Sequence, residues 1–179
     1  SERAVRTLAR LDAGQGVPKL LGCLEDQRAR FAIYGLRAVL ADMPAAQAVE
    51  ILRGVSLKKV TVAKEVVRLL GELRSDDAYL LLIALDRPEL HRDIRIALCR
   101  ALWDHLHREQ TWQILERAAT GPDFILATRI GDIPAERLTV ASDAKLAQVL
   151  TLVLNRPEPE ARRELLLKAP TLPLRDHGR

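Results

Sequence analysis

Hydrophobic residues return along this chain at the alternating spacings of three and four that mark an amphipathic helix. The clearest example is one apolar stripe near the middle of the chain: Val62, Val66, Leu69, Leu70 and Leu73. Residues three and four apart lie on the same face of a helix, so the stripe predicts a helix that buries one side. No stretch alternates apolar and polar residues between hairpin turns, and we therefore predict an all-α fold.

A longer period organises these helices. An arginine flanked by apolar residues returns every 31 or 32 residues, at Arg6, Arg37, Arg68 and Arg100. Each repeat also contains a second, more apolar segment, at residues 17–26, 45–54, 77–86 and 110–119. Turn or cap residues lie between the segments, at 12–16, 42–44, 74–77 and 86–89. A fixed period of this length, with two helices in each repeat, is typical of stacked helical arrays.

The segment from Ile94 to Leu106 carries apolar residues on two sides of one predicted helix. One side contains Ile94, Leu98 and Ala101, and the other contains Ile96, Cys99, Trp103 and Leu106. A helix with two apolar sides has to lie between other helices, as it does in the middle of a stacked array.

The period decays beyond residue 120. Two glycines and two prolines interrupt it, at Gly121, Pro122, Gly131 and Pro134. They leave room for a short helix near 123–130 and then an irregular stretch. Two interpretations of residues 120–142 stay open, namely a binding loop and a decayed repeat.

Two more helices are predicted before the chain ends. Ser142 or Asp143 is the expected N-cap of a helix that ends near Leu154. A last helix is expected from about Pro159, which suits a first turn, to Lys168. The last residues, 170–179, contain two prolines and no hydrophobic period. They are expected to form a loose tail.

These features resemble HEAT repeats, in particular the bacterial HEAT-like type of the phycobilin lyases. Residues 4–26 ("AVRTLARLDAGQGVPKLLGCLED") carry the resemblance best, and residues 66–102 match again. The resemblance implies an α-α superhelix, a HEAT-like solenoid of about five helical pairs. Its regular repeats would cover 3–119 and its degenerate repeats 120–169. Because the motif is a packing pattern, the resemblance implies a fold and no particular activity.

The composition excludes several classes of protein, namely disordered, disulfide-rich and membrane-spanning ones. Hydrophobic residues make up 48% of the 179 residues, which is enough to build a core. Cys23 and Cys99 have no C-x-x-C partner, so we expect free thiols in a reducing, cytoplasmic compartment. The longest apolar run, at 79–85, is far shorter than the roughly 20 residues of a membrane helix, so no membrane insertion is expected. Since the chain opens with Ser1 inside a helical pattern, we expect it to be a fragment of a larger protein.

No motif in the sequence predicts an enzyme. Nucleotide-binding glycine loops, the nucleophile elbow of hydrolases and the zinc motif H-E-x-x-H are all missing, so we predict no catalytic residue, cofactor or metal site. His105 and His107 would point about 200° apart on a helix and could not share a metal. His105 is instead expected to pack inside. Trp103 and Asp104 distantly resemble the aromatic and carboxylate pair of HEAT-like DNA glycosylases, but Trp103 lies on an apolar side.

The repeated arginines are the candidate partner-binding residues. Three have acidic residues at helical spacing: Arg6 with Glu2, Arg68 with Glu65 and Glu72, and Arg100 with Asp104. Arg37 has no acidic neighbour on its own helix. The arginines are either salt-bridged surface positions or, once stacked, a ridge that meets an acidic partner.

We therefore expect a non-enzymatic scaffold for protein–protein interaction, whose partner is another protein or another domain of the parent chain. The alternative is a nucleic-acid-binding module that uses the basic ridge for phosphate contacts, since the net charge is +4. Acidic and basic residues are interleaved, and acidic neighbours that neutralise the ridge would favour a protein partner. A spacer without a ligand is a third possibility.

Overall fold

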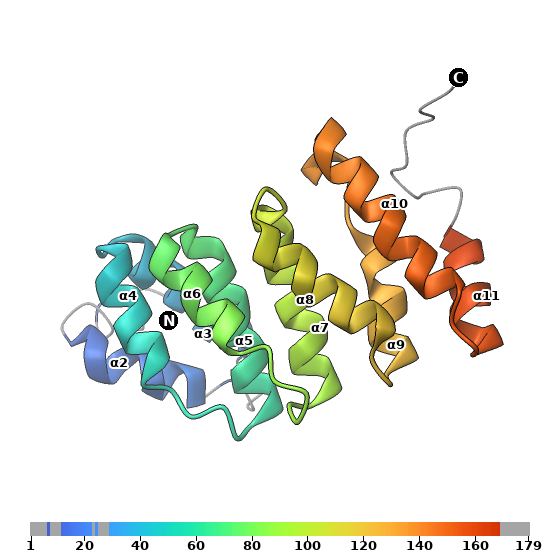
Figure 1. Cartoon of the computed structure of the whole chain (residues 1–179). Coiled ribbons are helices and arrows are strands. Elements are labelled where there is room, and N and C mark those ends of the chain that lie inside the picture. Colours follow the sequence, from blue (N-terminus) through green and yellow to red (C-terminus); the bar gives the residue numbers. More distant parts are fainter. Residues whose placement is uncertain (1–6, 8–11, 23, 25–28, 169–179) are drawn as a thin grey trace. The chain divides into compact units, whose positions relative to one another are not determined.

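The computed structural model describes residue 7, residues 12–22, residue 24 and residues 29–168. Within these ranges the chain forms ten α-helices and no strand, which confirms the all-α prediction (Figure 1). Its contacts divide it into two units, Ser1–Arg87 and Pro88–Arg179. Nearly all of the expected first helix, together with Cys23 and the tail at 170–179, lies outside the described residues.

The described part of the first unit contains five helices. They are α2 (Ala13–Gly22), α3 (Ala29–Ala41), α4 (Ala45–Arg53), α5 (Val60–Leu73) and α6 (Asp76–Ala84). Each helix packs on the next one, and α4 also contacts both α2 and α6. The predicted pair of helices is therefore confirmed for the second and third periods, with α3 and α4 in one and α5 and α6 in the other, while the first helix of the first period lies outside the described residues.

The apolar stripe of α5 is buried as predicted. Val62, Val66, Leu69 and Leu70 are almost fully shielded from solvent, while Leu73 at the end of the helix is half-buried. Burial of one such side chain contributes about 1.5–3 kcal/mol. The buried surface also includes Ala63 and Val67, so α5 is enclosed on more than one side.

The break expected at 12–16 is wrong. Helix α2 begins at Ala13, directly after Asp12. The Asp12 carboxylate accepts a hydrogen bond from the N–H of Gln15 (3.2 Å), which is the contact of an N-cap. This cap fixes the start of the helix, and the two glycines that suggested a turn lie inside it. The breaks at 42–44 and 86–89 are confirmed.

The second unit contains five α-helices and three short 3-10 segments in its described part. The α-helices are α7 (Arg92–Ala101), α8 (Glu109–Thr120), α9 (Phe124–Thr128), α10 (Val140–Leu154) and α11 (Pro159–Lys168). The 3-10 segments are η2 (Leu102–His105), η3 (Arg129–Asp132) and η4 (Ala135–Arg137). Helix α9 contacts α7, α8, α10 and α11, so the shortest helix lies among all the others.

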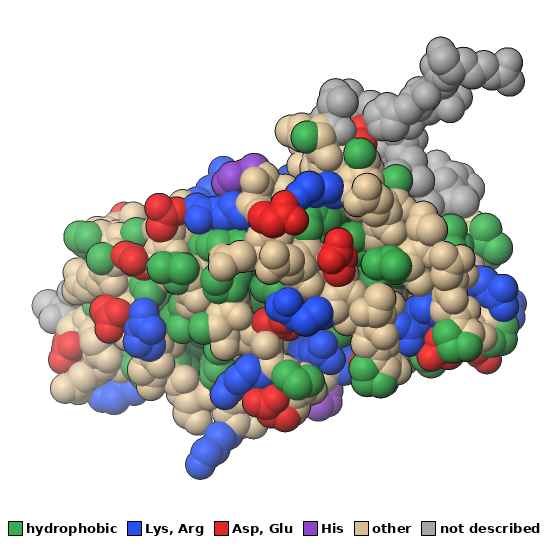
Figure 2. Space-filling view, viewed as in Figure 1, with side chains coloured by type: hydrophobic (Ala, Val, Ile, Leu, Met, Phe, Trp, Pro, Cys, Tyr) green, Lys and Arg blue, Asp and Glu red, His purple; other side chains and the backbone are tan. Residues whose placement is uncertain are grey.

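The surface bears mixed charges. Figure 2 shows basic and acidic side chains interleaved on the visible face, as the composition predicted. Between residues 88 and 168 the basic and acidic residues are equal in number.

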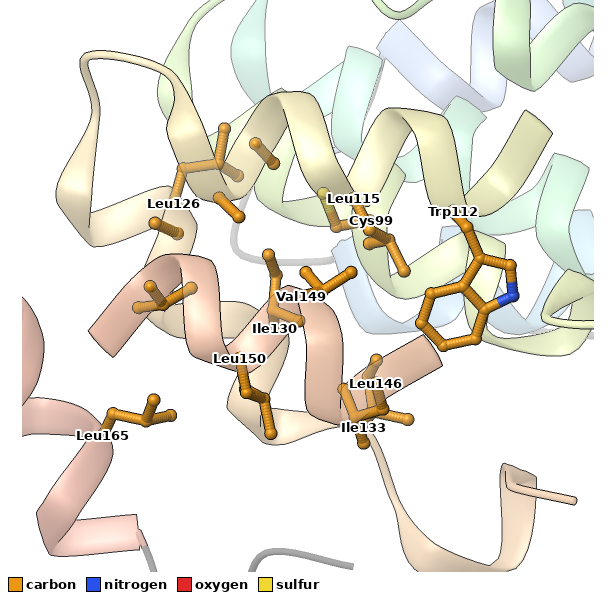
Figure 3. Close-up of a cluster of buried hydrophobic side chains, with 14 of the residues drawn as sticks. Cys99, Trp112, Leu115, Leu126, Ile130, Ile133, Leu146, Val149, Leu150 and Leu165 are labelled. Carbon is orange, nitrogen blue, oxygen red and sulfur yellow. The ribbon is translucent and has the colours of Figure 1, made fainter. Parts of the chain in front are cut away.

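One hydrophobic cluster forms the core of the second unit (Figure 3). Side chains from α8 and α10 meet there, with Trp112 close to Leu146. The indole N–H of Trp112 donates to the carbonyl of Leu106 (2.7 Å), so its one polar atom is satisfied inside the core. Leu126 and Ile130 belong to the same cluster. The stretch 120–142 therefore supplies side chains to the core, while the choice between a binding loop and a decayed repeat stays a prediction.

Two predicted helix boundaries in this unit are wrong. The helix expected over Ile94–Leu106 ends at Ala101 and continues as the 3-10 segment η2, although each of its apolar sides contains buried residues. The N-cap of α10 is Thr139, which lies before the predicted Ser142 or Asp143. Thr139 Oγ1 accepts from the N–H of Ser142 (3.3 Å), and Ser142 Oγ accepts from the N–H of Thr139 (2.7 Å). Ser142 is thus the second member of a capping box.

A buried arginine closes the end of α8. The Arg156 side chain is 6% exposed, and its Nη1 donates to the carbonyls of Ala119 (2.6 Å) and Gly121 (2.7 Å). Its Nε and Nη2 pair with Glu158, at 3.0 Å each. The last carbonyls of a helix have no intrahelical donor and carry partial negative charge, so a guanidinium is well suited to them.

Asp123 joins the start of α9 to α7. Its Oδ1 accepts from the N–H groups of Ile125 (3.1 Å) and Leu126 (3.3 Å), and its Oδ2 accepts from Arg92 Nε (2.6 Å). Partial burial raises the pKa of Asp123, but the hydrogen bonds from Arg92 and Leu126 outweigh this effect and leave the pKa below its ordinary value.

We expect Arg156→Met to lower the free energy of unfolding by about 2–4 kcal/mol, because two carbonyls lose their donor and each costs about 1–3 kcal/mol. Urea denaturation measures the change. The matched control is Arg163→Met, at an exposed position of α11, which should stay within about 0.5 kcal/mol of the wild type. Equal stability of the two variants would contradict the role of Arg156.

We expect Asp123→Asn to keep the helix cap but lose the charge pair with Arg92, which lowers the free energy of unfolding by up to about 1 kcal/mol at neutral pH. The difference from the wild type is complete above the unfolded-state pKa of about 3.9. It disappears as the pH falls through the lower folded-state pKa. Denaturation at several pH values measures this difference in the free energy of unfolding, with the exposed Glu116→Gln variant as control. A difference that does not change with pH would contradict the charge pair between Asp123 and Arg92.

Candidate functional site

The four arginines of the predicted ridge have different surroundings. Arg6 lies outside the described residues. Arg37 and Arg68 belong to the first unit, and Arg100 belongs to the second. The structure therefore tests their local contacts, while their use as a partner-binding ridge stays a prediction.

Arg37 and Arg68 share one carboxylate. Arg37 donates to Glu72 through Nε (3.1 Å) and Nη2, which links α3 to α5. Arg68 also donates to Glu72, and its Nε lies 2.8 Å from Glu65 Oε2. The hydrogen bonds that Arg68 donates to Glu65 raise the pKa of Arg68, although partial burial opposes the shift. The two pairs predicted for Arg68 are confirmed, and the partner of Arg37 is a residue that helical spacing could not reveal.

This arrangement balances two positive charges with two negative ones. Because Arg37 and Arg68 direct hydrogen-bond donors at carboxylates of their own unit, an incoming phosphate would have to compete with Glu72 and Glu65. The geometry favours the salt-bridged interpretation at these two positions.

The predicted pair of Arg100 with Asp104 is wrong. The α-helix ends at Ala101, and the chain continues with three residues per turn, so a residue four positions ahead of Arg100 is rotated away from it. Asp104 instead pairs with Arg137. Arg100 Nη2 lies 3.9 Å from Asp132 Oδ2.

Asp132 is approached by three cations, and we call these four residues the Asp132 cluster: Arg100, Arg129, Asp132 and Lys168. Arg129 Nη1 lies 3.7 Å from the same Oδ2 that faces Arg100. Lys168 Nζ donates to Asp132 Oδ1 (2.5 Å) and to the carbonyl of Thr128 (3.1 Å). Only Arg100 had a signal in the sequence, because the other members come from η3 and α11 and meet it through folding.

Large apolar side chains are exposed on the last two helices. Leu166 and Leu167 of α11 are 64% and 71% exposed, and α10 exposes Leu152 and Leu154 to a lesser degree. We call Leu166 and Leu167, which are adjacent in sequence, the leucine surface. Helix α11 buries Ala161 and Leu165 and contacts α10, so its exposed leucines lie on the side away from its packed residues.

The residues considered for chemistry are mostly part of the core. Cys99 is a buried cysteine that forms no disulfide with a described residue, and Trp103 packs against the core of the second unit. His105 is buried as predicted, but its ring centroid lies only 6.2 Å from that of His107, because this stretch is not α-helical. In the part of the chain that the structure describes, no group of three His, Cys, Asp or Glu residues could hold a metal ion. No described helix has the length and apolarity needed to cross a membrane.

We expect a double-mutant cycle of Arg37→Met and Glu72→Gln to give a coupling of about 0.5–1 kcal/mol, because Glu72 is held by two arginines. The control cycle uses Arg53 and Glu50, a pair within α4, and should give about 0.2–0.5 kcal/mol. Urea denaturation of the wild type and of the three variants of each cycle measures both couplings. A coupling of zero between Arg37 and Glu72 would leave the Arg37 guanidinium available to a partner and restore the ridge interpretation there.

Comparison with known proteins gives no further guide to function. The chain matches no protein-family model, and no curated protein and no solved structure is significantly similar to it. The resemblance to HEAT repeats therefore rests on residues 4–26 and 66–102 alone.

Proposed function

We propose that this chain is a non-enzymatic scaffold for protein–protein interaction, built as a HEAT-like solenoid. The observation that carries the proposal is the leucine surface. Soluble proteins seldom expose neighbouring large apolar side chains, and where they do, such a surface usually binds another protein. Leu166 and Leu167 are adjacent in sequence, and both are mostly exposed.

The pattern of contacts within each unit supports the solenoid. Helices two apart in the chain touch: α4 contacts α2 and α6, α9 contacts α7 and α11, and α8 contacts α10. Stacked helical repeats have this pattern, because each helix packs on its neighbour and on the equivalent helix of the next repeat. Such arrays offer extended surfaces to partners.

The charges favour a protein over a nucleic acid as the partner. Nucleic-acid binding depends on cations that are available to phosphates. Arg37 and Arg68 are paired with carboxylates, and residues 88–168 have no excess of basic side chains.

We expect the double substitution Leu166→Glu and Leu167→Glu to abolish binding of the natural partner, since two charges would replace the apolar contact. The tagged protein is purified from cells of its source, and proteins that copurify with it are quantified. Recovery of the partner should fall at least about tenfold, a loss of roughly 1.4 kcal/mol or more.

The control is Leu80→Glu, which makes the same leucine-to-glutamate change at an exposed position of α6 in the other unit. It should leave recovery of the partner unchanged, and thermal unfolding should show that both variants are folded. If the double variant recovers the same partner in the same amount as the wild type, the leucine surface is not the binding site.

A further inference from the structure

We propose that the Asp132 cluster binds an acidic side chain of the protein partner, whose carboxylate bridges Arg100 and Arg129. This inference rests on the proposed protein-binding function and adds the chemistry of one contact. It requires a partner segment in which an acidic residue stands near apolar ones.

The first argument is the charge of the cluster. Three cations surround the single carboxylate of Asp132, so two positive charges are not neutralised within the cluster. Lys168 is the cation that serves Asp132 directly, at 2.5 Å, and its other bond to Thr128 fixes it in place. The two arginines are therefore not needed to satisfy Asp132.

The second argument is that both guanidinium groups are available. Arg100 and Arg129 lie 3.9 Å and 3.7 Å from Asp132 Oδ2, which is longer than a hydrogen bond. Within the described residues, neither guanidinium group donates a hydrogen bond to a different side chain or carbonyl. The Arg100 side chain is 54% exposed and that of Arg129 is 38% exposed. Arg37 and Arg68 differ in this respect, because their donors are engaged by Glu72 and Glu65.

The third argument is the spacing. Since the two nitrogens lie 3.9 Å and 3.7 Å from the same oxygen, they are at most 7.6 Å apart. Two charge-assisted hydrogen bonds of about 2.8 Å each, together with the width of a carboxylate, span such a gap. An anion between the arginines would also remove their mutual repulsion.

The fourth argument identifies the source of the anion. Lys168 directly follows Leu167, so the cluster adjoins the leucine surface along α11. A protein segment with a carboxylate beside leucine-like side chains is complementary to both. A nucleic acid would need a row of available cations along its backbone. The cluster offers two guanidinium groups at one point.

The test is a titration of the protein with the capped peptide acetyl-Glu-Glu-Leu-Leu-amide, observed by NMR of the arginine Nε–Hε groups. We expect the signals of Arg100 and Arg129 to shift together and saturably at about 0.15 M salt, with no shift at Arg53. Arg100→Gln and Arg129→Gln should each weaken binding at least about tenfold, whereas Arg53→Gln should not. Asp132→Asn should tighten binding, because it removes the competing carboxylate.

Three comparison probes separate the alternatives. The peptide with Gln in place of Glu should bind at least about tenfold more weakly. If inorganic phosphate binds as tightly as the peptide, the cluster takes any small anion and the inference is overturned. Tighter binding of single-stranded oligothymidylate than of the peptide overturns it in favour of a nucleic acid, and unchanged Arg100 and Arg129 signals overturn it outright.

The inference and the proposed function can fail separately. If the natural partner is lost with the leucine double variant but retained by both Arg100→Gln and Arg129→Gln, the scaffold stands without the anion site. If the peptide binds as expected while the leucine variant keeps its partner, the anion site stands and the leucine surface does not.

Discussion

Short helices are not stable alone in water, so every described helix of this chain has to pack against another helix. Its described α-helices are only five to fifteen residues long, near or below the length at which an isolated helix becomes marginal. Each one therefore depends on burying a side against another helix. Short helices also have many ends for their length, and polar side chains such as those of Asp12, Asp123 and Arg156 satisfy those ends.

The sequence predicts the part of this fold that depends on local spacing. The stripe of α5 and the limits of α11 follow from the three-and-four pattern and from a proline in a first turn. Errors occur where two local signals compete. The glycines of α2 suggested a turn, but the cap at Asp12 begins a helix there, and Ser142 has the side chain of an N-cap although it completes the box of Thr139.

The candidate site was less predictable, because its contacts cross the chain. The bond between Arg37 and Glu72 joins residues 35 positions apart, and the Asp132 cluster combines side chains from α7, η3 and α11. A helical period identifies which residue occupies a repeated position. The period contains no information about which residue of another helix folding brings into contact with that position. Only pairs within one helix, such as Arg68 with Glu65, could be foreseen.

The change from α-helix to 3-10 helix after Ala101 has a consequence for the charge environment of the arginine that precedes it. Arg37 and Arg68 are held by carboxylates of their own unit. Beyond Arg100 the helical twist changes, Asp104 pairs with Arg137, and Arg100 lies 3.9 Å from Asp132. The backbone that follows a side chain can in this way decide which charged groups that side chain meets.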